Sequence, residues 1–210
     1  MKKLLLLLLV SVLLLQCDDD SDSVVKDASG NAYETVVLGD QTWITSNLKS
    51  TRFCDGSEIT TSFNYFGVDT LVTKYGRLYP WSVMDEGKNP CPCGYHIPSE
   101  EEYNRLVAFL GNDHGAKMKA QNQWQWNGEY ATNLSGLNMM PSFWFDTFMT
   151  STNDYIKSDL NSRTYGYYWL NESSSEFYAK GFMLSYNGKT SNLVDSFEKS
   201  TYRAIRCLKD

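Results

Sequence analysis

The stretch CPCGYHIPSEEEYNRL, residues 91–106, decides how the centre of this chain folds, because it contains a complete set of signals for the start of a helix. Ser99 is a favourable N-cap residue, and Glu102 three residues later completes a capping box. Pro98 ends any earlier helix. The acids at 100–102 fall in the first turn, where the helix dipole favours negative charge. Helix physics therefore explains these acids without a catalytic role.

The residues that follow predict the length of this helix and its buried face. Tyr103, Leu106, Val107 and Leu110 are spaced so that they form one apolar stripe on a helix. Gly111 is a typical residue just past a helix C-terminus. We expect a helix over 100–110 that packs on the core through this stripe.

His96 and the two cysteines before it are the obvious candidates for chemistry. His96 alternates with Tyr95 and Ile97 in a segment that we expect to be extended, which favours a structural hydrogen-bonding role over that of a catalytic base. Zinc needs about four ligands, commonly in paired C-x-x-C or H-x-x-x-H spacings, whereas this stretch has C-P-C. We therefore predict no metal site, no cofactor and no catalytic residue.

The N-terminus predicts the compartment. Two lysines precede an apolar run that has the length of a signal-peptide core, too short to span a bilayer, which needs about 20 residues. LLQC, residues 14–17, resembles a bacterial lipobox, although Gln16 departs from the usual small residue. We expect residues 1–16 to be a lipoprotein signal peptide, and Cys17 to carry acyl chains such as palmitate that hold the protein on a membrane. An uncleaved N-terminal anchor is the alternative.

Residues 17–30 begin CDDDSDS, and we predict a solvated, flexible acidic tether there. The acids resemble the signal that follows the lipidated cysteine in many lipoproteins of gut Bacteroidota and sends them to the outer face of the outer membrane. We therefore expect the outer membrane and the cell surface. A plain linker that leaves the protein facing the periplasm is the alternative.

Composition limits the possible partners. The chain of 210 residues has a formal charge of −6, and loss of residues 1–16, which hold two lysines and no acid, makes it more negative still. Such a charge is a poor match for nucleic acid or for anionic head groups. Aromatic residues make up 14% of the chain, which excludes a disordered stalk. Residues 31–210 are predicted to be one domain.

Four cysteines remain after Cys17, in an oxidising compartment that favours disulfides. A bridge between Cys91 and Cys93 across one proline would be strained. Each of them should therefore bond to a distant partner, Cys54 or Cys207, and the spacing leaves open which pairs with which.

Elsewhere, strand and turn signals dominate. A hairpin is predicted over residues 33–44 around Gly39-Asp40, and two aromatic strands over 164–189 with an Asn187-Gly188 turn. TYRAIRCLKD, residues 201–210, predicts a final strand. The region from about 112 to 165 is expected to form long ordered loops.

Several segments together resemble a known family. VVLGDQTWITSNLKS, GRLYPW, CPCGYHIPSEEEYNRL, SGLNMMP and YRAIRC occur in the order seen in the Fibrobacter succinogenes major paralogous domain family. The resemblance implies a bond between Cys91 and Cys207, which leaves Cys54 to pair with Cys93. This family looks related to C-type-lectin-like folds, including formylglycine-generating enzymes. The expected fold class is thus α+β, a single loop-rich, disulfide-stapled, C-type-lectin-like domain.

We expect a non-catalytic binding or structural module with a glycan or an outer-membrane protein complex as partner. The alternatives are a formylglycine-generating-type oxidase, which needs reactive thiols, and a glycan-processing enzyme, whose two carboxylates need only be close in space. The calcium motifs of C-type lectins are absent.

The aromatic residues suggest where a partner would bind. Trp43, Trp81, Trp169 and one of Trp124 and Trp126 are expected in the core, which leaves Trp144 as the candidate binding residue. Ser23 and Thr70 lie in Asp-Ser/Thr-aliphatic triplets that resemble O-glycosylation sites of exported Bacteroidota proteins.

Overall fold

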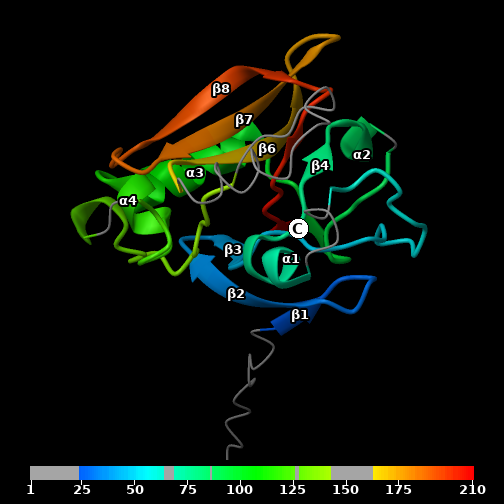
Figure 1. The fold of residues 1–210 in the computed structure, drawn as a ribbon, viewed down its shortest axis with the longest axis horizontal. Helices are drawn as coiled ribbons and strands as arrows, with labels where there is room; N and C mark the ends of the chain where they lie inside the picture. Colours follow the sequence, from blue (N-terminus) through cyan, green and yellow to red (C-terminus); the bar gives the residue numbers. More distant parts are fainter. Residues whose placement is uncertain (1–23, 64–68, 86, 126–127, 143–162) are drawn as a thin grey trace, which may run out of the picture.

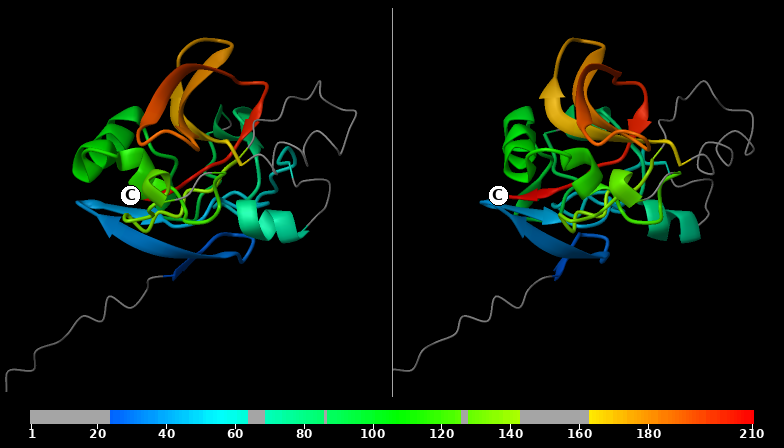
Figure 2. Two further views of the ribbon diagram at one scale, coloured as in Figure 1. Left: turned by 60° about the vertical axis from the view of Figure 1, so that its left-hand side comes forward. Right: turned by 90° about the vertical axis from the view of Figure 1, so that its left-hand side faces the viewer.

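The computed structural model describes residues 24–63, 69–85, 87–125, 128–142 and 163–210, and within them it is rich in strands and has few helices. Three sheets have the strand orders β1-β2-β3-β10-β5, β6-β7-β8 and β4-β9. The five-stranded and three-stranded sheets lie at opposite ends of the molecule, with α3 and α4 beside the latter (Figures 1 and 2). The elements are β1 (Val24–Lys26), β2 (Ala32–Leu38), β3 (Gln41–Ile44), α1 (Asp69–Tyr75), β4 (Tyr79–Pro80), α2 (Ser82–Asp85), β5 (Tyr95–His96), α3 (Glu100–Leu110), α4 (His114–Met118), η2 (Gly128–Tyr130), β6 (Tyr165–Ser173), β7 (Tyr178–Ser185), β8 (Ser191–Glu198), β9 (Tyr202–Arg203) and β10 (Leu208–Lys209).

The predicted helix over 100–110 is confirmed. α3 begins after Ser99, whose side chain accepts a hydrogen bond from the Glu102 backbone N–H, while the Glu102 carboxylate accepts one from the Ser99 backbone N–H. It ends at Leu110, and Gly111 adopts a positive φ of 66°. Its apolar stripe packs under the three-stranded sheet, where Tyr103 stacks on Phe182 at 4.5 Å between ring centroids.

The predicted hairpin is also confirmed. β2 and β3 pair antiparallel from Thr35 opposite Ile44 to Leu38 opposite Gln41, so that Gly39 and Asp40 form the turn. The two aromatic strands correspond to β6 and β7, and the Asn187-Gly188 turn leads into β8.

The core consists of two clusters. One lies between α3 and the three-stranded sheet, and the other includes Ile44 of β3, Tyr79 of β4 and the two cysteines of the Cys91–Cys207 bond. The tryptophans predicted to be buried are at most 3% exposed, namely Trp43, Trp81, Trp124 and Trp169. Trp126 lies outside the described residues.

Two disulfides close the fold around β10. Cys91 bonds Cys207 and Cys54 bonds Cys93, which is the pairing that the family resemblance implied. The Cys91–Cys207 bridge spans 116 residues and, in the chain-entropy model, contributes about 5 kcal/mol. It fixes β10 between β3 and β5, and so brings the end of the chain beside its middle.

The prediction that residues 17–30 form a flexible tether is wrong for residues 24–30. Val24–Lys26 form β1, which pairs with β2 from Val24 opposite Glu34 to Lys26 opposite Ala32. Asp27 closes the following turn, because its carboxylate accepts hydrogen bonds from the backbone N–H groups of Ser29 and Asn31 and from the Tyr33 hydroxyl at 2.6 Å. An acid that was assigned to a solvated tether is in fact 6% exposed.

The prediction of one final strand is also wrong. Residues 202–203 form β9 and pair with β4, residues 208–209 form β10 in a different sheet, and Cys207 lies between them. The intervening segment leaves the strand conformation because it buries Arg206, which is 0% exposed. The region after 112 contains α4 and η2, and its residues 131–142 form loop structure, as expected.

Candidate functional site

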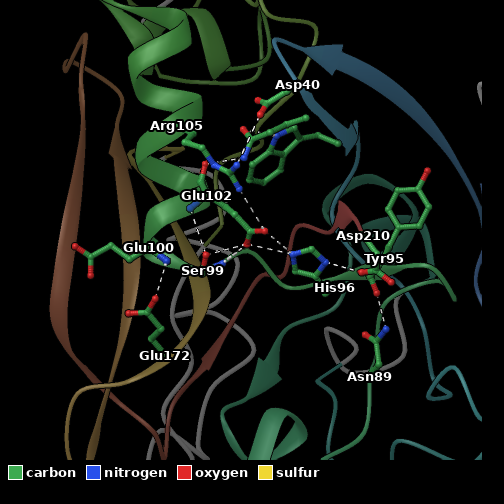
Figure 3. A network of polar contacts seen from close by, with 12 residues as sticks. Asp40, Asn89, Tyr95, His96, Ser99, Glu100, Glu102, Arg105, Glu172 and Asp210 are labelled. Carbon is green, nitrogen blue, oxygen red and sulfur yellow. Dashed lines mark hydrogen bonds and ion pairs between the residues drawn. The ribbon is translucent and has the colours of Figure 1, made fainter.

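His96 lies at the centre of a polar network formed by β5, by the start of α3 that follows it, and by the distant C-terminal end of the chain (Figure 3). β5 carries His96 and pairs with β10, which places Leu208 opposite His96 and Asp210 just beyond it. α3 contributes Glu102 from its first turn. The His96 Nδ1 atom is 2.6 Å from Asp210 Oδ1, and its Nε2 atom is 3.0 Å from Glu102 Oε1.

Glu102 is held in place from several directions. Its Oε2 atom accepts hydrogen bonds from the Ser99 backbone N–H at 2.8 Å and from the Ser99 hydroxyl at 2.9 Å. Burial alone would raise the pKa of Glu102, but the hydrogen bonds from Ser99 and His96 outweigh it and the pKa is lowered. Glu102 is therefore a stable anion. Gln41 ties the same turn to β3 by donating to the Glu102 backbone carbonyl at 2.9 Å.

The two carboxylates restrict what the imidazole can do. Both ring nitrogens are engaged, and only the protonated ring can donate to both partners at once. A general base needs a free nitrogen within reach of a proton, and the Ser99 hydroxyl donates to Glu102 and not to His96. Glu102 and Asp210 also lie at opposite ring nitrogens, so the two carboxylates and the imidazole cannot coordinate one metal ion together. His96 joins β5, β10 and α3, in agreement with its predicted structural role.

A recess of about 390 Å³ opens beside this network. Its polar lining includes Lys88, Asn89, Asn171, His96 and Asp210. Asn89 is occupied by the chain itself: its side chain donates to the Tyr95 carbonyl at 2.5 Å and accepts from the Cys91 N–H at 2.9 Å. Asn89 therefore serves to hold the disulfide region together, and its side chain is not free to bind a ligand in the recess.

A second group of acids lies at the start of α3, near β6 and β7. The Lys180 ammonium is 2.5 Å from Glu100 Oε2 and 2.8 Å from Glu172 Oε2, and Glu172 also accepts from the Glu100 backbone N–H. The hydrogen bond from Lys180 is the main reason that the pKa of Glu172 is lowered, and the two carboxylates raise the pKa of Lys180 in turn. This arrangement ties the helix to the sheet and keeps the Glu172 carboxylate ionised at neutral pH.

His114 has a similar structural role. Its Nε2 atom accepts from the Ser191 backbone N–H at 3.0 Å, while its Nδ1 atom is 3.3 Å from the Gly111 carbonyl. This pattern assigns the neutral tautomer with the proton on Nδ1. His114 thus links α4 to β8.

The other sequence-predicted site residues are only partly within the described structure. Cys17, Ser23 and Trp144 lie outside the described residues, so their proposed roles stay predictions. Thr70 is exposed in the first turn of α1, where its hydroxyl is accessible, and its modification also stays a prediction. Within the described ranges, no cluster of three or more His, Cys, Asp or Glu side chains is arranged to hold a metal ion, and no helix is long and apolar enough to cross a membrane.

Comparison with known proteins establishes the family. A family model, the Fibrobacter succinogenes major domain, matches residues 36–209. The chain belongs to the Fibrobacter succinogenes major domain family. Searches of curated proteins and of solved structures found no match. The family match includes both disulfides, β5, α3 and His96, and Asp210 follows directly after it.

Sequence reasoning missed Asp210, Lys180 and Glu172. No local signal marks them, because each acts through a partner that is distant in sequence. His96 and Asp210 are 114 residues apart, and Lys180 and Glu100 are 80 apart. Only the adjacency of β5 and β10, and of α3 and β7, brings these groups together.

Proposed function

We propose that this Fibrobacter succinogenes major domain protein is a lipid-anchored protein of the outer-membrane surface, and that its C-type-lectin-like domain is a non-catalytic binding or structural module for a glycan or protein partner. The state of His96 is the observation that carries the proposal. The strongest acid–base candidate of the described chain has both ring nitrogens committed to the carboxylates of Glu102 and Asp210.

The cysteines argue against a formylglycine-generating-type oxidase. Such an enzyme needs a reactive thiolate, which requires an unpaired cysteine. Cys54, Cys91, Cys93 and Cys207 form two disulfides, so none of them is available.

The acids argue against a glycan-processing enzyme. Its general acid must stay protonated at neutral pH, which requires a raised pKa. Among the described residues, the carboxyl groups whose pKa departs from the ordinary value are all shifted downward, namely Asp55, Glu102, Glu129 and Glu172. This pattern supports a role in which charges hold the fold.

The start of β1 limits how far the domain can stand from its proposed anchor. Only six residues separate Cys17 from Val24. A fully extended chain reaches about 3.5 Å per residue, so the start of β1 stays within about 25 Å of Cys17. Such a short connection suits a module that acts at the membrane surface.

Protease treatment of intact cells tests the location. The full-length protein should be cleaved without disruption of the outer membrane. Cys17→Ala should abolish fractionation with membranes. Replacement of Asp18, Asp19 and Asp20 by alanine should leave the lipid in place but make the protein resistant until the outer membrane is opened. Protection of the wild-type protein in intact cells would contradict the surface location.

Quantitative pull-down tests the binding role. The full-length protein should retain a defined glycan or protein from surface-labelled, detergent-solubilised cells. Conversion of a retained glycan or peptide by the purified protein, with loss of that conversion on a single carboxylate substitution, would contradict the non-catalytic role.

A further inference from the structure

A groove of about 470 Å³ lies away from His96, between β2, the loop after β3, the end of α1 and the loops at 120–123 and 138–140. α1 lies close to β2 in each of the three views (Figures 1 and 2). The apolar part of the lining comes from Ala32, Ala120 and Met140. The groove is thus a concave surface with a small apolar component and walls that come from distant parts of the chain.

The buried Arg206 side chain connects these walls by hydrogen bonds. Its Nη1 atom donates to the carbonyls of Ile44 at 3.2 Å and Leu137 at 3.0 Å. Its Nη2 atom donates to Asn47 Oδ1 at 2.9 Å and to the Asn138 carbonyl at 3.3 Å. One fully buried guanidinium therefore bridges the loop after β3 and the loop that contains Asn138.

The third wall is attached to the same cation through Asn47. The Asn47 side chain donates to the Tyr75 carbonyl at 2.8 Å, at the end of the helix that carries Lys74. Gly76 makes this approach possible: its φ is 77°, and a Cβ atom there would lie 2.5 Å from the Asn47 Cβ. The groove is therefore preorganised, which lowers the entropy cost of binding.

The fourth wall is held by hydrogen bonds to the Met139 backbone carbonyl. The Ala120 N–H donates to the Met139 carbonyl at 2.9 Å, and the Trp124 indole N–H donates to the same carbonyl at 3.0 Å. Lys119, next to Ala120, is buried and donates to the Ser185 carbonyl at 2.5 Å. Its burial lowers the pKa of Lys119 to about 8.

Of the polar side chains that line the groove, Gln121 donates to the Thr132 carbonyl and Asn138 accepts from the Asn133 amide. Three others differ from these. Within the described part of the chain, the Glu34 carboxylate, the Ser46 hydroxyl and the Gln123 amide make no hydrogen bond to another residue. The Lys74 ammonium lies over the Tyr75 ring at 5.0 Å. The groove thus presents an acid, a hydroxyl, an amide and an ammonium group to solvent.

The chemistry of these groups selects the class of ligand. One acid and one ammonium balance each other, so neither an anionic nor a cationic ligand is favoured. Carboxylate, amide and hydroxyl groups together pair well with the hydroxyls of a sugar, which both donate and accept. An extended peptide would need an unpaired strand edge. At this groove β2 is paired on both sides, with β1 and with β3.

We infer that the groove over Arg206 is a binding site for a neutral oligosaccharide. This inference rests on the proposed binding function and gives it a location and a ligand class. Glu34, Ser46 and Gln123 bind sugar hydroxyls directly, and Arg206 is a positioning residue that holds the walls at the correct spacing.

A glycan array with the full-length chain captured at high density on beads tests this inference, because dense display compensates for the weak affinity of a single sugar site. The array should contain neutral oligosaccharides together with uronic-acid and sulfated ones. Binding to one or more neutral structures is expected, and its affinity should change less than about twofold between low and high salt, since no net charge is neutralised.

Matched variants locate the site. Gln123→Ala and Glu34→Ala should each weaken binding of the best neutral oligosaccharide at least tenfold. Gln125→Ala changes the same residue type two positions later, on an exposed side chain outside the groove, and should have less than a twofold effect. Asn171→Ala, in the recess beside His96, should also leave affinity unchanged.

Three results would overturn the inference: no binding to any neutral oligosaccharide, binding to acidic glycans only, or neutral binding that Gln123→Ala and Glu34→Ala leave intact. Capture of a protein partner without glycan binding would contradict the assignment of the groove as a sugar site but would still agree with the proposed binding function. Turnover of a glycan would instead remove the proposed function.

Discussion

Replacement of Arg206 by methionine should destabilise the domain more than any other single change to a buried cation. Methionine keeps most of the side-chain volume but has no donors. The substitution therefore leaves four acceptors inside the protein without their partner: the carbonyls of Ile44, Leu137 and Asn138 and the amide oxygen of Asn47.

Two opposing effects set the magnitude. A hydrogen bond to a charged group contributes about 1.5–3 kcal/mol net, so four bonds give an upper bound of about 6–12 kcal/mol. Burial of the charge acts in the other direction: Arg206 is 0% exposed, and its burial lowers the pKa to about 10. Methionine removes this desolvation cost, which is several kcal/mol. The expected net loss of unfolding free energy is about 3–5 kcal/mol.

Arg203 provides a matched control three residues away. It is 5% exposed and burial lowers its pKa to about 9, yet its Nε and Nη1 atoms have no hydrogen-bond partner among the described residues. Its guanidinium packs instead on aromatic rings, at 3.8 Å from the Phe197 centroid and 4.8 Å from that of Trp169. Arg203→Met should therefore cost only about 1–2 kcal/mol, the range of a desolvated cation–π contact.

Urea unfolding followed by tryptophan fluorescence under non-reducing conditions measures both variants, with the free energy taken from the midpoint and slope. The reasoning is refuted if Arg206→Met costs less than about 1 kcal/mol, or if it costs no more than Arg203→Met. Arg206→Lys keeps the charge but loses the planar fork, and should fall between wild type and Arg206→Met.

Three further predictions concern acid stability, the disulfides and Trp144. Because the pKa of Glu102 is lowered in the fold, its contribution to stability is fully present above the unfolded value near 4.5 and is lost as the pH falls through the folded value. Urea midpoints should therefore decline less between pH 7 and pH 3 for Glu102→Gln than for wild type. An equal decline in the two proteins would contradict this prediction. The double variant Cys91→Ala/Cys207→Ala should lower the unfolding free energy by about 5 kcal/mol, and Cys54→Ala/Cys93→Ala should lower it by about 4 kcal/mol. Non-reducing peptide mapping should detect no free thiol among these four cysteines in the wild type. The reverse ranking of the two double variants, or a titratable thiol, would contradict the pairing argument. Trp144→Ala should weaken partner binding while melting temperature stays nearly unchanged, and a large fall in melting temperature would place Trp144 in the core.

The sequence was informative where structure depends on neighbours in the chain. The capping box of Ser99 and Glu102 and the stop at Gly111 define α3 without tertiary information. The Gly39-Asp40 turn fixes the β2–β3 register in the same way. The disulfide pairing needed one further input, the family resemblance, because the spacing alone left the partners of Cys91 and Cys93 open.

The remaining features depend on contacts that span the chain. The final segment divides into β9 and β10 because Arg206 turns inward to carbonyls 162 and 69 residues away. β1 forms because Asp27, an acid in an acidic stretch, becomes buried against Tyr33. The groove has walls from β2, α1 and three loops. Ser46 and Asn138 lie in segments that resemble the family, but nothing local in those segments shows that they meet Glu34 and Gln123 across one groove.

The most direct test of the central claim, binding without conversion, is mass spectrometry of the compounds that the full-length protein retains from solubilised cell-surface material. Retained compounds are eluted after overnight incubation with wild type or with His96→Gln, and their masses are compared with those of the input. The account predicts the same masses with both proteins, because His96 has a structural role. A product that forms with wild type and is absent with His96→Gln would contradict it.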